Sequence, residues 1–240
     1  MPIKMAEPEK ISGKIVKIRL FLVQKLNMCL DALFLMANPE NASFFEKIAD
    51  LRLKKNKEFE NAVLRKIGGM NRRHSVSGPE LQLLFEQAKK AKGGCIVEIG
   101  SYFGISTIAL AHGTRMGAKR RVYAVDPHKR GSFREFGKNV NAAGVEATVF
   151  AVRDSSKNAA SGWKEKISLL FIDGGHTYKN AKTDILEWSR HLEKNGTIVV
   201  HDVSFGLYRN VGRAAREEIM ESGKFSRFSK LGSMLIAKKN

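Results

Sequence analysis

Apolar side chains in the first part of the chain recur with the spacing of helices, and residues 1–92 are predicted to be helical throughout. Between Ile11 and Met36 the apolar positions follow a helical period. A second helical stretch is predicted from about Phe44 to Ile67. A third is predicted from Ser77 to Lys92, because Ser77 can cap a helix and the proline two positions later suits a first turn.

From Gly93 onward the pattern changes to short apolar runs that alternate with helical segments. Such alternation predicts βαβ units and a parallel sheet that is covered on both faces. The last two runs have no helix between them, so they predict a closing antiparallel hairpin. The predicted strands are Cys95–Ile99, Arg121–Val125, Ala147–Val152, Ile167–Ile172, Thr197–His201, Phe225–Ser229 and Met234–Lys238, and the predicted helices lie near 104–114, 131–143, 178–193 and 207–222.

The length of 240 residues fits one large domain with an appendage. We predict a helical region over residues 1–76, followed by an α/β domain over residues 77–240. The stretch 11–36 is apolar on more than one face, which leaves three roles open: packing on the domain, forming a homo-oligomer, or lying on a membrane surface. No apolar run reaches the ~20 residues of a membrane-spanning helix, and no signal-peptide pattern is present. The predicted location is the cytoplasm, with peripheral membrane contact as an alternative.

The chain is strongly basic, with 42 Lys and Arg residues against 24 Asp and Glu residues and a net charge of +18. This charge favours an anionic partner such as nucleic acid, anionic lipid or an acidic small molecule. A highly solvated surface without such a partner explains the same charge. The two cysteines are far apart in the sequence, which excludes a disulfide scaffold and a cysteine-based zinc site.

The first predicted strand of the sheet runs into a turn with two glycines, Gly100 and Gly104. They allow a sharp turn and the close approach of a ligand at the start of the next helix. The turn differs from the dinucleotide-binding pattern, because Tyr102 stands where that pattern has its second glycine. Asp126 ends the next strand, where its carboxylate can accept hydrogen bonds from ribose hydroxyls.

Two further strands end in polar residues: Asp173 and His176 follow one, and His201 and Asp202 end the other. Neighbouring strands lie about 4.8 Å apart, so Asp173 and Asp202 could share one divalent cation. An imidazole ligand at His201 suits a transition metal better than Mg²⁺. A histidine that only stabilises a loop remains the alternative for His201, and a helix-capping histidine for His176.

The pattern ExGxxxGxS from Glu98 to Ser106, with Asp126 after it, resembles the first motif and the ribose-binding acid of class I S-adenosylmethionine-dependent methyltransferases. The IDGxH and HD segments resemble the metal-assisted O-methyltransferases of the macrocin O-methyltransferase and cephalosporin-hydroxylase-like branch. The likeness implies an α/β fold with a Rossmann-like, seven-stranded, mostly parallel sheet and a C-terminal antiparallel hairpin. It also makes residues 77–240 the S-adenosylmethionine-binding domain.

The resemblance implies roles for individual residues. Asp173 and His176 would be catalytic, with His176 as the base that takes the acceptor's proton. Asp173 and Asp202, with His201, would hold Mg²⁺ or another divalent cation. The cofactor-binding residues implied are Glu98, Gly100, Ser101, Tyr102, Gly104, Ser106, Asp126, Asp154, Ser155 and Asp173.

The function predicted from these features is methyl transfer to a hydroxyl of a small molecule, such as a sugar or a secondary metabolite. Lys129 and Arg130 lie at the expected active edge and are predicted to recognise an anionic acceptor, and Tyr178 to line its pocket. An RNA methyltransferase that uses the basic surface is one alternative. A non-catalytic binding protein tethered through residues 11–36 is the alternative of another class.

Overall fold

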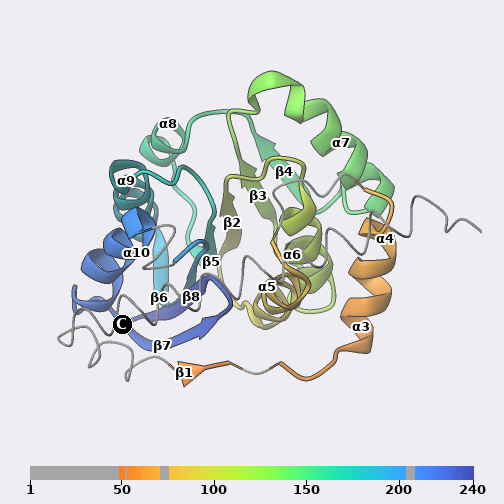
Figure 1. The fold of residues 1–240 in the computed structure, drawn as a ribbon. Helices are drawn as coiled ribbons and strands as arrows, with labels where there is room; N and C mark the ends of the chain where they lie inside the picture. Colours follow the sequence, from red (N-terminus) through yellow and green to blue (C-terminus); the bar gives the residue numbers. More distant parts are fainter. Residues whose placement is uncertain (1–48, 52, 71–75, 204–208) are drawn as a thin grey trace, which may run out of the picture.

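The computed structural model describes residues 49–51, 53–70, 76–203 and 209–240, and the predicted helix within 11–36 lies outside them. The described residues form one eight-stranded sheet in the order β1-β7-β8-β6-β5-β2-β3-β4. Helices cover both of its faces (Figure 1). The strands are β1 Ala49–Asp50, β2 Cys95–Ile99, β3 Val122–Val125, β4 Val149–Val152, β5 Ile167–Ile172, β6 Leu192–Val200, β7 Phe225–Leu231 and β8 Met234–Lys239.

The pairing of the strands confirms the predicted architecture. Strands β4, β3, β2, β5 and β6 are parallel to one another, and β8 pairs antiparallel with both β6 and β7. Every residue of β2 and β5 is buried, as expected for central parallel strands with helices on both sides. The seven predicted strands, β2 to β8, are therefore present, and β1 adds a short edge strand parallel to β7.

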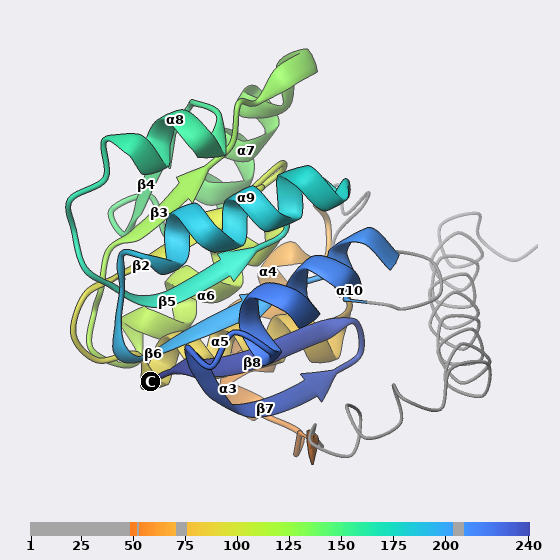
Figure 2. The same ribbon diagram turned by 90° about the vertical axis from the view of Figure 1, so that its left-hand side faces the viewer.

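The helices lie on the two faces of the sheet (Figure 2). Each set packs in its own hydrophobic cluster. Alternate residues of β5 illustrate the division, because Leu169 and Phe171 belong to one cluster, and Leu170 and Ile172 to the other. The first face carries α3 Lys57–Phe59, the π-helical turn η2 Glu60–Leu64, α4 Arg65–Ile67, α5 Gly78–Lys90, α6 Ile105–Arg115 and α7 Ser132–Ala143. The second carries α8 Ser156–Ser161, α9 Tyr178–Ser189, α10 Arg209–Ala215 and the π-helical turn η4 Arg216–Met220.

The prediction of a helix from Phe44 to Ile67 is wrong over part of its length. Residues 49–50 form β1, and Leu51 N donates to Lys230 O at 2.9 Å. This segment therefore runs beside β7 at the edge of the sheet. The helix begins only at Lys57, because Asn56 caps it by accepting a hydrogen bond from Phe59 N at 3.1 Å.

Two other segments also differ from the prediction. Helix α9 ends at Ser189 and not at residue 193 as predicted, and strand β6 already begins at Leu192. The short helix α8 was not predicted at all. The division into two regions at residue 76 stays a prediction, although Phe59, Val63 and Ile67 lie in the same cluster as α5 and α6.

The order of the strands indicates at which edge of the sheet a ligand would bind. From β2 the chain moves outward to β3 and β4, and it then returns to the other side of β2 for β5 and β6. Such a switch point opens a crevice beyond the carboxyl ends of the strands, where open α/β sheets bind ligands. Among the described residues, no helix combines the length and the apolar character that crossing a bilayer requires.

The packing of α5 on α6 generates a stability prediction. A Cβ added at Gly113 in α6 would lie 2.2 Å from the carbonyl oxygen of Phe85 in α5, whereas a Cβ at Gly137 in α7 meets nothing within 4 Å. We expect Gly113→Ala to lower the free energy of unfolding by about 2 kcal/mol, since the two helices must move apart. Gly137→Ala should raise it by about 0.5 to 1 kcal/mol. Urea unfolding of both variants checks this, and equal effects would contradict the packing described.

Candidate active site

The turn after β2 is shaped by the protein itself. Gly100 has φ of 88° and Gly104 has φ of 82°, which favours glycine at both positions. A Cβ at Gly100 would lie 2.1 Å from the carbonyl oxygen of Asp173, and a Cβ at Gly104 would meet the Phe136 ring at 3.0 Å. The glycines therefore allow the end of β2 to approach the end of β5 and allow α6 to pack on α7.

Asp126 joins the glycine turn to the loop after β3. One oxygen, Oδ2, accepts a hydrogen bond from Tyr102 N at 2.9 Å, and Oδ1 accepts one from His128 N at 2.6 Å. Tyr102 and His128 both have positive φ, 42° and 48°, which is uncommon for residues with a side chain. The carboxylate thus fixes two strained loops at the rim of the crevice, where the predicted ribose contact would form.

Glu98, by contrast, lies in the interior. Its side chain is fully buried, and the hydroxyl of Thr107 in α6 donates to its Oε2. Burial raises the pKa of Glu98 to about 8. Ser101 in the turn and Ser106 at the start of α6 are also buried. The Glu98 carboxyl group therefore links β2 to α6 from inside.

Asp154 and Ser155 follow β4 at the same edge and together start helix α8. Ser155 Oγ accepts from Asn158 N at 3.2 Å, which is the usual cap bond. Asp154 Oδ1 accepts from Ser155 N at 2.6 Å and from Asn158 Nδ2 at 3.2 Å. These bonds account for the two residues locally, and their predicted contact with adenine stays a prediction.

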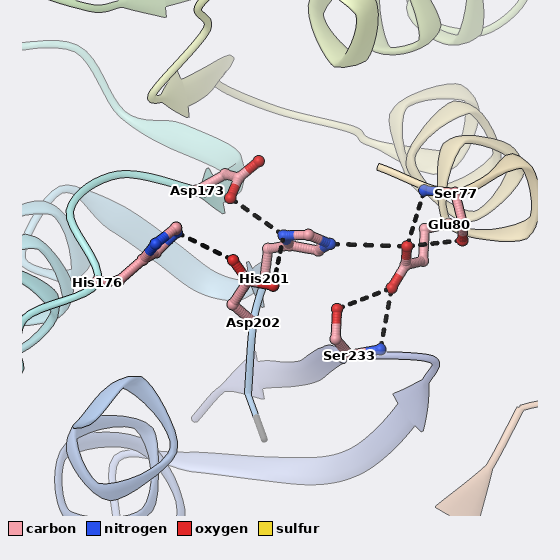
Figure 3. A network of polar contacts seen from close by, with 7 residues as sticks. All are labelled: Ser77, Glu80, Asp173, His176, His201, Asp202 and Ser233. Carbon is pink, nitrogen blue, oxygen red and sulfur yellow. Dashed lines mark hydrogen bonds and ion pairs between the residues drawn. The ribbon is translucent and has the colours of Figure 1, made fainter. Parts of the chain in front are cut away.

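Three predicted residues converge beyond β5 and β6 (Figure 3). His201 Nδ1 lies 3.1 Å from Asp173 Oδ1 and 3.4 Å from Asp202 Oδ1. Within the described residues these three side chains form the group whose ligand atoms all lie within 4.8 Å of one another. Asp202 has φ of 56°, so its carboxylate is held there by a backbone conformation that asparagine and aspartate adopt more readily than most residues.

The surroundings shift the pKa values of Asp173 and Asp202 in opposite directions. Burial raises the pKa of Asp173, and the nearby His201 offsets this only in part. Burial also acts on Asp202, but hydrogen bonds with His176 and His201 and their charges bring its pKa well below the ordinary value. Burial alone would lower the pKa of His201, yet the charge of Asp173 and bonds with Asp173, Asp202 and Glu80 raise it well above 6.5.

His176 stands at the exposed end of this cluster. Its Nε2 lies 2.9 Å from Asp202 Oδ2, and its side chain is 48% exposed. The hydrogen bond with Asp202 raises the pKa of His176, against the effect of its partial burial. When the neutral ring donates from Nε2 to Asp202, Nδ1 carries the lone pair that can accept a proton.

Glu80 belongs to the same network and was not predicted. It lies on α5, is only 3% exposed, and its Oε2 is 3.6 Å from His201 Nε2. Burial alone would raise the pKa of Glu80, but His201 and Ser77 lower it to about 2. The spacing of Ser77 and Glu80 is a sequence signal for a capping box, and the structure contains that box. It gives no sign of the contact with His201.

The cluster fits a small divalent cation by its chemistry and spacing. Ligand atoms bonded to one metal ion at about 2.1 Å lie roughly 3 to 3.5 Å apart, which matches the separations of His201 Nδ1 from both carboxylates. The other ring nitrogen of His201 faces Glu80, as is usual for metal-binding histidines. Imidazole among the ligands favours a transition metal over Mg²⁺.

The predicted acceptor residues lie around this edge without a common contact. Tyr178 starts α9, and its hydroxyl donates to Glu217 Oε2 at 2.5 Å and accepts from Lys182 Nζ at 3.1 Å. Lys129 is exposed in a short 3-10 turn after β3, η3 Lys129–Gly131, and the side chain of Arg130 lies outside the described part. Their roles toward an acceptor stay predictions.

The sheet and its helices have the fold of class I methyltransferases, as the sequence predicted. Residues 97–203 match the model of a family described as a methyltransferase domain. This range runs from β2 to the residue after Asp202, so it holds the glycine turn and the acid cluster. The match supports the prediction of a methyltransferase enzyme.

Solved structures share the fold at low sequence identity. A methyltransferase from Podospora anserina, solved with SAH bound, is 14% identical, with a TM-score of 0.63 over 100% of this chain and 99% of that one. An O-methyltransferase from Bacillus cereus in complex with SAH is 19% identical, with a TM-score of 0.58 over 79% and 94%. TomG, an O-methyltransferase from Streptomyces achromogenes involved in tomaymycin synthesis and solved with SAM, is 17% identical, with a TM-score of 0.57 over 85% and 96%.

The buried Glu98 generates a prediction about pH. Its pKa of about 8 in the folded state exceeds its ordinary value, so the folded protein keeps a proton that the unfolded chain releases above about pH 4.5. This contribution to stability is complete below that pH and is lost as the pH rises toward 8. Between pH 5 and 8 the wild type should therefore lose, relative to Glu98→Gln, roughly 3 to 4 kcal/mol of unfolding free energy. Urea unfolding at several pH values measures the difference, and parallel curves would contradict it.

Proposed function

We propose that this protein transfers a methyl group from S-adenosylmethionine to a hydroxyl group of a small molecule, with His176 as the general base. The observation that supports this most directly is the 2.9 Å contact between His176 Nε2 and Asp202 Oδ2 at the edge of the switch point. O-methyltransferases among the structural neighbours support the oxygen acceptor. The acceptor's identity as a sugar or a secondary metabolite remains part of the proposal.

S-adenosylmethionine supplies an electrophilic methyl group, and the protein must hold it, place the acceptor hydroxyl and remove one proton. The glycine turn and the Asp126 carboxylate form the binding side of the crevice. On the other side, Asp202 orients the His176 ring and stabilises the imidazolium that forms when Nδ1 takes the proton. Positioning of the two reactants contributes much of the rate enhancement.

A divalent cation held by Asp173, His201 and Asp202 is the second part of the proposal. When bound, it would lower the pKa of an acceptor hydroxyl and so assist the removal of its proton. The separations of the three ligand atoms and the carboxylate behind His201 support it. With Glu80 beside His201, three acidic side chains lie together here, and a cation would partly neutralise them.

The donor site can be tested with Asp126→Asn, which keeps the size of the side chain and removes its charge. We expect the affinity for S-adenosylmethionine to fall about tenfold or more, because a charged acceptor is lost from the ribose contact. Isothermal titration calorimetry measures this. Glu135→Gln, which changes a partly exposed carboxylate on α7 that pairs with Lys138, is the control and should bind like the wild type. Equal affinities of the Asp126→Asn variant and the wild type would refute the assignment.

The base can be tested with His176→Ala. The expected result is a kcat that is 100-fold to 10,000-fold lower, with the affinity for S-adenosylmethionine unchanged, since only proton removal is lost. Lys179→Ala replaces a neighbouring exposed side chain and is the matched control. The measurement is methylation of a set of hydroxylated acceptors that the wild type accepts. A normal kcat in the His176→Ala variant would mean that another group removes the proton from the acceptor.

A further inference from the structure

Glu80 is a buried carboxylate with more partners than a helix cap needs. Its Oε2 accepts from Ser77 N at 2.9 Å, which is the capping-box bond, and also from Ser77 Oγ at 2.6 Å. Its Oε1 accepts from Ser233 N at 2.9 Å and Ser233 Oγ at 3.0 Å, in the turn between β7 and β8 (Figure 3). A capping box requires neither this second set of bonds nor a carboxylate that is 3% exposed.

The same carboxylate faces the ring of His201. Oε2 of Glu80 is 3.6 Å from Nε2, while Nδ1 on the other side of the ring lies 3.1 Å from Asp173 Oδ1. A carboxylate therefore faces each ring nitrogen. Turning the ring over would aim carbon atoms at both, so this placement selects one orientation of the imidazole.

We propose that Glu80 is a positioning residue that holds the His201 ring with Nδ1 toward Asp173 and Asp202, and so completes a site for a transition-metal cation. The inference rests on the proposed cation site and adds the residue that orders it. A histidine ligand commonly donates its other N–H to a carboxylate, which fixes its tautomer and ring orientation. In this protein that carboxylate comes from α5, a helix that carries none of the three ligands.

Glu80 also connects the site to two parts of the fold outside it. The four hydrogen bonds from Ser77 and Ser233 keep the carboxylate from turning away from His201. A Cβ at Gly232, which has φ of 59°, would lie 2.6 Å from Glu80 Oε1, so the turn approaches the carboxylate closely. The position of Glu80 is thus determined by the start of α5 and by the β7–β8 turn together.

The proposal predicts a selective loss of metal binding in Glu80→Gln. Isothermal titration of the full-length wild type with Co²⁺ and with Mg²⁺ should show that it binds Co²⁺ more tightly than Mg²⁺. We expect Glu80→Gln to weaken Co²⁺ binding 10-fold to 100-fold, since an amide cannot accept from both Ser233 and the imidazole. Circular dichroism establishes that the variants are folded.

Two controls separate positioning from a structural role. Glu86→Gln changes a carboxylate on the same helix that accepts from Asn56 and Gln82 and lies outside the His201 network. Glu86→Gln should bind Co²⁺ within about threefold of the wild type. Ser233→Ala removes one of the four hydrogen bonds to Glu80 and keeps the carboxylate, so it should weaken binding less than Glu80→Gln does. If Glu86→Gln weakens binding as much as Glu80→Gln does, the loss is a general effect of α5 and the proposal is overturned.

A measurement on the wild type keeps the test independent of any unstable variant. With Zn²⁺ added, ¹⁵N NMR of the His201 ring should show a metal-bound Nδ1 and a protonated Nε2. Binding through Nε2, or a ring unaffected by Zn²⁺, overturns the proposal. If the wild type binds Co²⁺ and Glu80→Gln binds it equally well, only the role of Glu80 fails. If the wild type binds neither metal, the cation site fails with it, while the assignment of His176 is judged by its own variant.

Discussion

The approach of the backbone at Gly100 to the backbone at Asp173 is the constraint on which the site depends. Asp173 N donates to Ile99 O at 2.8 Å, and no side chain fits at position 100. This contact brings the glycine turn that follows β2 next to Asp173, the first residue after β5. The glycine turn and the acidic cluster, which are the two sides of the proposed site, therefore follow neighbouring strands of the sheet.

The site gathers carboxyl groups in a strongly basic chain. Glu80, Asp173 and Asp202 lie beside two histidines within a protein of net charge +18. Carboxylates suit a cationic methyl donor and a metal ion. An anionic acceptor would have to keep its charged group away from this cluster, toward exposed basic residues such as Lys129.

The sequence was sufficient to predict the bounds of strands that are buried on both faces of the sheet. The bounds of β2 and β5 match the predicted ones, because a run of apolar residues between helical segments leaves little choice of register. It failed where a single polar residue decides the boundary, as with Asn56, which starts α3 inside a stretch of continuous helical periodicity. The acid cluster was predicted from strand ends, whereas Glu80 was missed because its local spacing already had an explanation as a helix cap.

The bond between Glu80 and Ser233 also bears on how the protein folds. These two residues are 153 positions apart, so the carboxylate is buried without its full set of partners until the last hairpin has docked. Contacts this distant in sequence form late, because closing a long loop costs entropy before any interaction offsets it. The cluster behind the active edge should thus be among the last parts to become ordered, and intermediates that lack β7 and β8 would expose a charged, incomplete site.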